Sequence, residues 1–75
     1  MGLEYDIDIQ VAGPEHRGKT TLVAYLTKLL TEAGAELVVQ RADEQIDDKL
    51  ALSPEQLREK IAGKRIFLRE IQHFP

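Results

Sequence analysis

One stretch of eight residues, Gly13–Thr20, restricts the local fold of this chain more than any other feature. It reads G-P-E-H-R-G-K-T, which matches G-x-x-x-x-G-K-[ST] at every required position. Before it, residues 5–11 alternate between apolar and polar side chains, which predicts a strand. After it, apolar side chains recur every three or four positions over residues 18–33, which predicts a helix capped by Gly34. The apolar stripe of this helix is expected to consist of Leu22, Leu26, Leu29, Leu30 and Ala33.

The rest of the chain predicts two more strands and one more helix. Residues 35–41 contain a short apolar, β-branched run, and residues 64–72 contain several large apolar side chains, so each fits a strand. Between them, Ser53 is the expected N-cap of a short helix, with proline at the first helical position and Gln56 completing a capping box. The acidic residues 43–49 show little apolar periodicity and are expected to form a surface loop or a frayed turn.

This order of elements predicts one α/β domain over residues 1–75, with a three-stranded, mostly parallel sheet and two helices. Seventy-five residues are too few for two independent cores, and a chain with no cysteine has no disulfide to support a small core. The first strand has a polar face with Asp6, Asp8 and Gln10, whereas a central parallel strand is apolar on both faces. Either both helices pack on the other face, or a second subunit covers the polar one.

Composition excludes several classes of protein. Hydrophobic residues make up 43% and charged residues 31% of the chain, which is typical of a folded domain rather than a disordered one. A net charge of −3 provides no overall positive field for a nucleic-acid backbone. No apolar run approaches the roughly 20 residues of a membrane span, and the first residues are acidic where a signal peptide is basic. We therefore expect a soluble, cytoplasmic protein without membrane or nucleic-acid partners.

The residue types in Gly13–Thr20 suit the binding of a phosphate group. Glycine lets the backbone turn sharply and approach a ligand, so that successive N–H groups converge on an anion. Lys19 supplies a positive charge, and Thr20 can place its hydroxyl on a magnesium ion. The predicted helix directs the positive end of its dipole at the same point. The candidate binding residues are Gly13, Pro14, Glu15, His16, Arg17, Gly18, Lys19, Thr20 and Thr21.

This pattern resembles the Walker A loop of the P-loop NTPase superfamily, and the resemblance covers residues 9–26, IQVAGPEHRGKTTLVAYL. The overall layout looks like the very small P-loop proteins predicted in bacteria and phages. The resemblance implies binding of a nucleoside triphosphate or diphosphate together with Mg²⁺. Members of the superfamily usually also carry an Asp at the end of a hydrophobic strand, which holds the magnesium through water. The last predicted strand departs from that pattern, because Arg69 stands where an acid is expected, and there is no Asn-Lys-x-Asp guanine reader.

Residues outside the strict motif allow more than one interpretation. Asp43 follows the second predicted strand and either receives the magnesium ion beside Thr20 or is a solvated acid. Arg17 either contacts phosphate or faces solvent, and His16 fits an exposed loop position better than a general base. Tyr25, about one turn beyond the motif, is expected to pack in the core or an interface rather than to stack on a base.

Three functions remain open from the sequence alone. The first is binding of a nucleotide through its phosphates, with no catalytic residue identifiable beyond the loop. The second is slow hydrolysis in a homo-oligomer that lends an arginine across an interface, the candidates being Arg41, Arg65 and Arg69. The third is a non-enzymatic module that sequesters a phosphorylated ligand. A homo-oligomer is expected, because alternation places Arg65, Phe67, Arg69 and Ile71 on one face, which fits an interface or a charge-protected edge strand.

Overall fold

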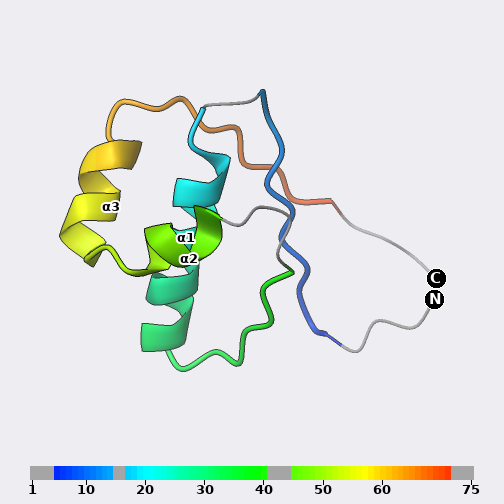
Figure 1. Ribbon diagram of the computed structural model, residues 1–75. Helices are drawn as coiled ribbons and strands as arrows, with labels where there is room; N and C mark the ends of the chain where they lie inside the picture. Colours follow the sequence, from blue (N-terminus) through cyan, green and yellow to red (C-terminus); the bar gives the residue numbers. More distant parts are fainter. Residues whose placement is uncertain (1–4, 15–16, 41–44, 72–75) are drawn as a thin grey trace.

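The helices of this chain begin and end where its glycines and capping residues direct. A computed structural model describes residues 5–14, 17–40 and 45–71. The described part contains three helices: α1 (Lys19–Glu32), α2 (Gln45–Leu50) and α3 (Pro54–Ile61). Both short helices pack against α1, and the extended segments run on the far side of α1 from α3 (Figure 1).

Helix α1 is the predicted first helix, and glycine stands at each end. Gly18 is its N-cap with φ +97°, and Gly34 follows its C-terminus with the same φ. At the C-terminal end the Ala35 N–H donates to the Leu30 carbonyl at 3.0 Å, and the Gly34 N–H donates to the Thr31 carbonyl at 3.0 Å. These two bonds form a Schellman motif, which requires a left-handed residue and so favours glycine there.

Helix α3 begins at the predicted capping box. The Ser53 side chain accepts a hydrogen bond from the Gln56 N–H at 3.1 Å, and the Ser53 N–H donates to the Gln56 side chain at 2.9 Å. Pro54 occupies the first helical position, where its missing N–H is not needed. The helix ends before Gly63, which has φ +83°. The prediction of this helix from Ser53 and Gln56 is therefore confirmed.

Helix α2 corrects the prediction of a loop over the acidic stretch. Residues 45–50 are helical, and within them Ile46 is 3% exposed. Leu50 lies one turn later and packs against the core cluster that contains Ile46. Two apolar residues four positions apart therefore hold this six-residue helix in place. Asp47 and Asp48 lie in its first turn and Lys49 in its last, an arrangement that complements the helix dipole.

The core lies between the three helices. It is built on Ala24, Ile46 and Leu57, with Val23, Tyr25, Leu50 and Leu52 packed around them. Helix α1 therefore turns Thr21 and Ala24 inward. The predicted stripe of leucines is not the buried face, and Leu29 is 40% exposed. The reason is that small side chains at positions 21 and 24 let two helices approach α1 closely, which a row of leucines does not.

Tyr25 packs in the core, as the sequence predicted. Its side chain packs against the cluster of Ala24, Ile46 and Leu57. Interaction with the Tyr25 hydroxyl, together with the nearby charge of Glu55, raises the pKa of the Arg58 guanidinium on α3 above its ordinary value. Tyr25 thus contributes to the packing of the core.

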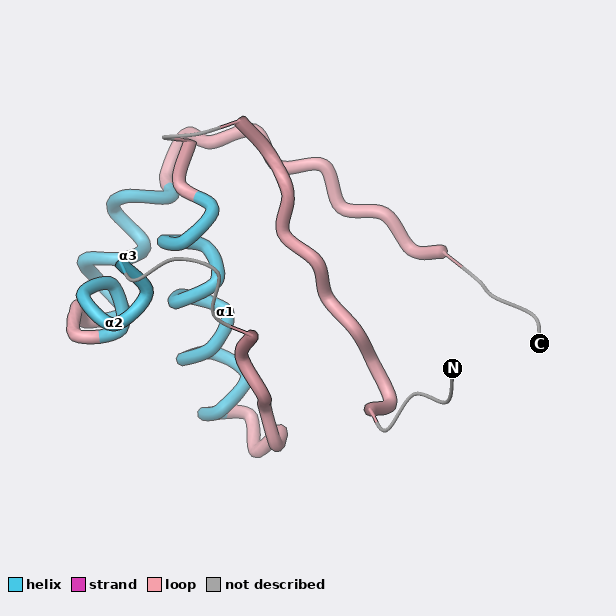
Figure 2. The backbone as a smooth tube through the Cα atoms, turned by 45° about the vertical axis from the view of Figure 1, so that its right-hand side comes forward, coloured by secondary structure: helices cyan, strands magenta, loops and turns pink. Residues whose placement is uncertain are grey.

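The predicted α/β fold with a three-stranded, mostly parallel sheet is wrong for the described part of the chain. No strand occurs there: residues 5–14, 35–40 and 64–71 are drawn as loops (Figure 2). An alternating pattern specifies which side chains share a face of an extended backbone. A strand also needs ladder hydrogen bonds from a neighbouring segment, which the pattern does not encode. The architecture described here is three helices with extended segments beside them.

These extended segments hold most of the exposed large hydrophobic residues. Apart from Leu29 they are Tyr5, Ile7, Ile9, Leu37, Val38, Ile66, Phe67, Leu68 and Ile71. None of the helices described is both long enough and apolar enough to cross a bilayer.

Candidate phosphate-binding loop

The motif of the sequence lies at the N-terminal end of α1. Gly18 adopts a left-handed conformation, φ +97° and ψ 20°, and accepts the first helical hydrogen bond from the Leu22 N–H at 2.9 Å. A β-carbon in this conformation is strained, so glycine is favoured at the point where loop becomes helix. Lys19, Thr20 and Thr21 then form the first turn of α1. The strict glycine and lysine of the motif therefore stand where a loop-to-helix anion site needs them.

The Lys19 side chain folds back across the loop. Its ammonium group donates hydrogen bonds to the Gly13 carbonyl at 2.7 Å and to the Pro14 carbonyl at 3.0 Å. The aliphatic stem of Lys19 runs past Gly13, where an added β-carbon would lie 3.8 Å from the Lys19 Cγ. The ammonium thus links the start of the motif to its end, and its charge lies over the loop.

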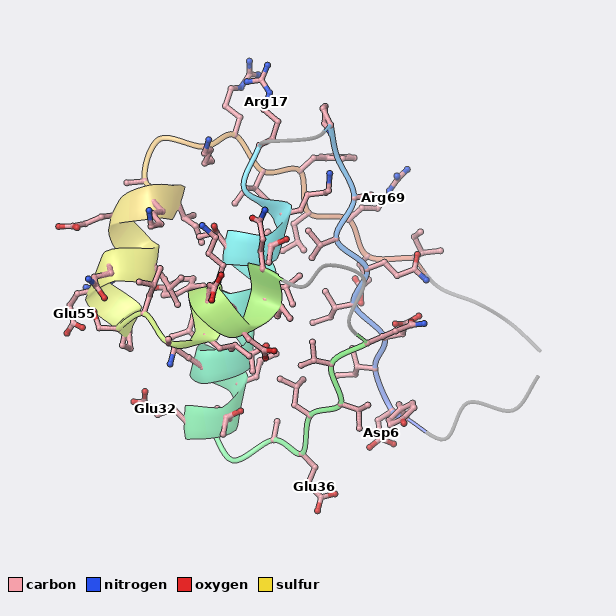
Figure 3. All side chains as sticks on the ribbon, viewed as in Figure 1. Asp6, Arg17, Glu32, Glu36, Glu55 and Arg69 are labelled. Carbon is pink, nitrogen blue, oxygen red and sulfur yellow. The ribbon has the colours of Figure 1, made fainter. Side chains whose placement is uncertain are left out.

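The N-terminus of α1 is electrostatically open to an anion. No side chain caps it, and its first turn contains no acidic residue. The first N–H groups of a helix have no intrahelical partner and carry a partial positive charge. Arg17 lies immediately before this turn, is exposed, and points outward from the same end of the molecule (Figure 3). Backbone N–H groups and two cationic side chains therefore gather at one end of α1.

A third cation reaches the loop from a distant part of the chain. The Lys64 Cε lies 3.7 Å from the point that a β-carbon on Gly18 would occupy. Lys64 is held there because the chain turns at Gly63 after α3, and the Lys64 N–H donates to the Ile61 carbonyl at 2.9 Å. The sequence contains no local signal for this contact, since only the packing of α3 on α1 brings the two positions together.

The two threonines of the motif differ in access. Thr21 is 6% exposed and turns toward the core of the three helices, whereas Thr20 is half-buried on the first turn of α1. Mg²⁺ keeps most of its water ligands and adds oxygen ligands from the protein and from phosphate groups. The Thr20 hydroxyl fits such a role. In the described part of the chain, no three His, Cys, Asp or Glu side chains gather as a metal site.

Several residues predicted for the site lie outside the described residues. These are Glu15 and His16 of the loop, the candidate magnesium ligand Asp43, and Arg41. Of the predicted binding residues, the structure places Gly13, Pro14, Arg17, Gly18, Lys19, Thr20 and Thr21 along one loop and the first turn of one helix.

Two glycines with the same φ allow a matched test of the loop conformation. We expect Gly18→Ala and Gly34→Ala each to lower the free energy of unfolding by about 1–2 kcal/mol, because alanine is strained in the left-handed region. Both sites have space for a methyl group. Urea unfolding followed by circular dichroism measures this loss. Only Gly18→Ala should also weaken ligand binding, so equal binding by both variants would contradict the role given to Gly18.

In a comparison with known proteins, no protein-family model, no curated protein and no solved structure matches the chain.

Proposed function

We propose that this chain binds a nucleoside triphosphate or diphosphate, together with Mg²⁺, through residues 13–20. The observation that carries the proposal is the position of the Lys19 ammonium. It lies over the loop on the carbonyls of Gly13 and Pro14, at the N-terminus of α1, whose first turn contains no acidic residue. The proposal also places the protein in the cytoplasm, where nucleotides and magnesium are available together.

Phosphate oxygens would replace the carbonyl partners of Lys19. A charge-assisted hydrogen bond from an ammonium to phosphate is shorter and stronger than one to a neutral carbonyl, which favours this exchange. The N–H groups at the start of α1 supply further donors to the same phosphate. Lys64 and Arg17 add positive charge at this end of a chain whose net charge is −3. Binding is thus directed to the phosphates rather than to the base.

Magnesium would join the ligand to the first turn of α1. The ion supplies charge neutralisation between neighbouring phosphates when it is bound. The Thr20 hydroxyl is the described side chain that fits it, with water and phosphate oxygens completing the coordination.

The described site supports binding better than rapid hydrolysis. Hydrolysis requires a residue that orients the attacking water, in addition to charge on the phosphates. The side chains placed beside the loop are cations, namely Arg17, Lys19 and Lys64, and none of these is suited to accept a proton from water at neutral pH. Phosphate release that rises steeply with protein concentration would instead indicate the slow, oligomer-dependent NTPase, and recovery of intact nucleotide would support a sequestering module.

Thermal unfolding with a panel of nucleotides tests the proposal. A ligand that binds only the folded chain stabilises it by about 2.7 kcal/mol at one hundred times its dissociation constant. For a domain of this size we expect the melting temperature to rise by roughly 10 °C or more. The rise should occur with ATP or GTP plus Mg²⁺ and not with the free nucleosides. No change with any nucleotide at millimolar concentration would contradict the proposal.

A separate variant tests the contribution of Lys64. We expect Lys64→Met to weaken nucleotide binding about 3- to 5-fold, since an exposed charge contributes roughly 0.7–1 kcal/mol to such an interaction. Lys60→Met on α3 removes an exposed lysine that lies outside the candidate site and is the matched control. Fluorescence titration with a labelled nucleotide measures both. Equal affinity of the two variants would show that Lys64 takes no part in binding.

A further inference from the structure

Two extended segments leave apolar side chains uncovered. The acidic segment, residues 5–11, exposes Ile7 to 79%, and the basic segment, residues 64–71, exposes Phe67 to 82% and Leu68 to 89%. Scattered exposed hydrophobic residues are ordinary on a protein surface, but a run of them along one segment marks a contact surface.

Both segments have two distinct faces. In the acidic segment the Gln10 amide donates to the Asp8 carboxylate at 3.2 Å, so these two polar side chains lie together. In the basic segment the Arg69 guanidinium lies 5.3 Å from the centre of the Phe67 ring. Each contact joins residues two apart, as expected along an extended backbone. In the acidic segment polar and apolar side chains therefore alternate, and in the basic segment Arg65 and Arg69 share a face with Phe67.

The charges of the two segments are complementary. Asp6 and Asp8 lie on one face of the acidic segment, and Arg65 and Arg69 lie on one face of the basic segment. All four side chains are exposed. The other face of the acidic segment holds Ile7, Ile9 and Val11, and the other face of the basic segment holds Ile66 and Leu68 between Lys64 and Glu70. Laying one segment along the other would match opposite charges on one side and apolar side chains on the other.

These segments do not cover each other within one chain. No ion pair joins the two aspartates to the two arginines among the described residues. Asp6 and Arg69 lie well apart and point in different directions (Figure 3). Each segment therefore has complementary charge available to another copy of the same chain.

The chain as a whole exposes more surface than a compact protein of the same mass. The chain exposes 7068 Å², whereas a compact monomer of its mass exposes about 4,700 Å². Its radius of gyration is 13.3 Å, compared with about 11 Å for a compact chain of this length. The chain is therefore less compact than a globular protein of its mass, and its extended segments keep surface that a partner can cover.

We propose that two copies of this chain form a symmetric dimer in which the acidic segment of each copy lies against the basic segment of the other. Twofold symmetry makes the two contacts identical, so the acidic segment and the basic segment of each copy both lie against an oppositely charged segment of the other copy. Lys64, the first residue of the basic segment, also reaches Gly18 of the loop, but the charges that join the two copies, on Asp6, Asp8, Arg65 and Arg69, lie outside residues 13–20, so the dimer does not depend on nucleotide binding.

Charge reversal tests the proposed dimer. Sedimentation equilibrium of the unmodified chain should give a dimer at micromolar concentration that dissociates as salt is raised. The variants Asp6→Lys with Asp8→Lys, and Arg65→Glu with Arg69→Glu, should each sediment as monomers because like charges then face each other. An equimolar mixture of the two variants should form a heterodimer, since both of its contacts again join opposite charges.

The mixing experiment separates contacts between copies from contacts within one chain. If the segments paired within a chain, both variants would lose that pairing, and mixing would restore nothing. Glu32→Lys with Glu59→Lys changes the net charge by the same amount as the aspartate variant on the surfaces of α1 and α3, and should leave the dimer intact. Circular dichroism confirms that each variant retains its helices. A monomeric unmodified chain, variants that remain dimeric, or failure of the mixture to associate would each overturn the proposal.

Discussion

Lys19→Ala is expected to weaken nucleotide binding about 100-fold or more while leaving the helical fold intact. The ammonium is the charge that lies over the loop, and its loss removes the strongest hydrogen-bond donor available to a phosphate. A 100-fold change corresponds to about 2.7 kcal/mol, within the range for truncating one partner of a hydrogen-bonded charge pair. The fold should persist because Lys19 makes its hydrogen bonds to exposed loop carbonyls rather than to the core.

Lys28→Ala is the control for this variant. Lys28 lies on the same helix, more than two turns from the loop. Its removal changes the net charge equally, so a general electrostatic effect would appear in both variants. Calorimetric titration with Mg-ATP distinguishes them: the Lys28 variant should bind like the unmodified chain. If Lys19→Ala binds Mg-ATP with full affinity, Lys19 takes no part in nucleotide binding.

Leu57→Ala is expected to unfold much of the protein at 25 °C. Leu57 is fully buried at the contact of α3 with α1, in a core whose other buried apolar members are Ala24 and Ile46. Truncating a buried leucine costs about 2–5 kcal/mol. A domain below 80 residues has roughly 3–5 kcal/mol of stability from such a core, so the loss is comparable to the whole.

Leu29→Ala makes the same chemical change at a position that is 40% exposed on α1. It should cost about 1 kcal/mol or less, since little apolar surface returns to water and alanine favours the helix. Urea unfolding monitored by the helical circular dichroism signal compares the two variants. Equal midpoints would show that the cluster around Leu57 is not the core.

Local structure in this chain follows closely from local sequence. The ends of α1 were predictable from Gly34 and from the motif, because left-handed residues and the loop-to-helix transition depend on a few neighbouring positions. The start of α3 was predictable from Ser53 and Gln56, whose reciprocal hydrogen bonds span only four residues. The motif marks Lys19 as a candidate binding residue, which stays a prediction, and its hydrogen bonds to the Gly13 and Pro14 carbonyls were not predicted.

Features that depend on distant partners were predicted poorly. Strands require hydrogen bonds from other segments, and alternation in residues 5–11 was interpreted as evidence for a sheet that the described residues do not form. The helix at residues 45–50 was missed because Ile46 and Leu50 are the apolar residues that indicate it. They stabilise the helix by packing on α1, which the local sequence does not show. Lys64 reaches Gly18 for the same reason, since the turn after α3 positions it.

The phosphates of a nucleotide are proposed to bind at the start of α1. Isothermal titration calorimetry with ATP, ADP and adenosine, each with Mg²⁺, tests this proposal most directly. We expect one site per chain for ATP and for ADP, and no detectable heat of binding for adenosine. Equal binding of adenosine, or no binding of ATP at millimolar concentration, would contradict the proposal.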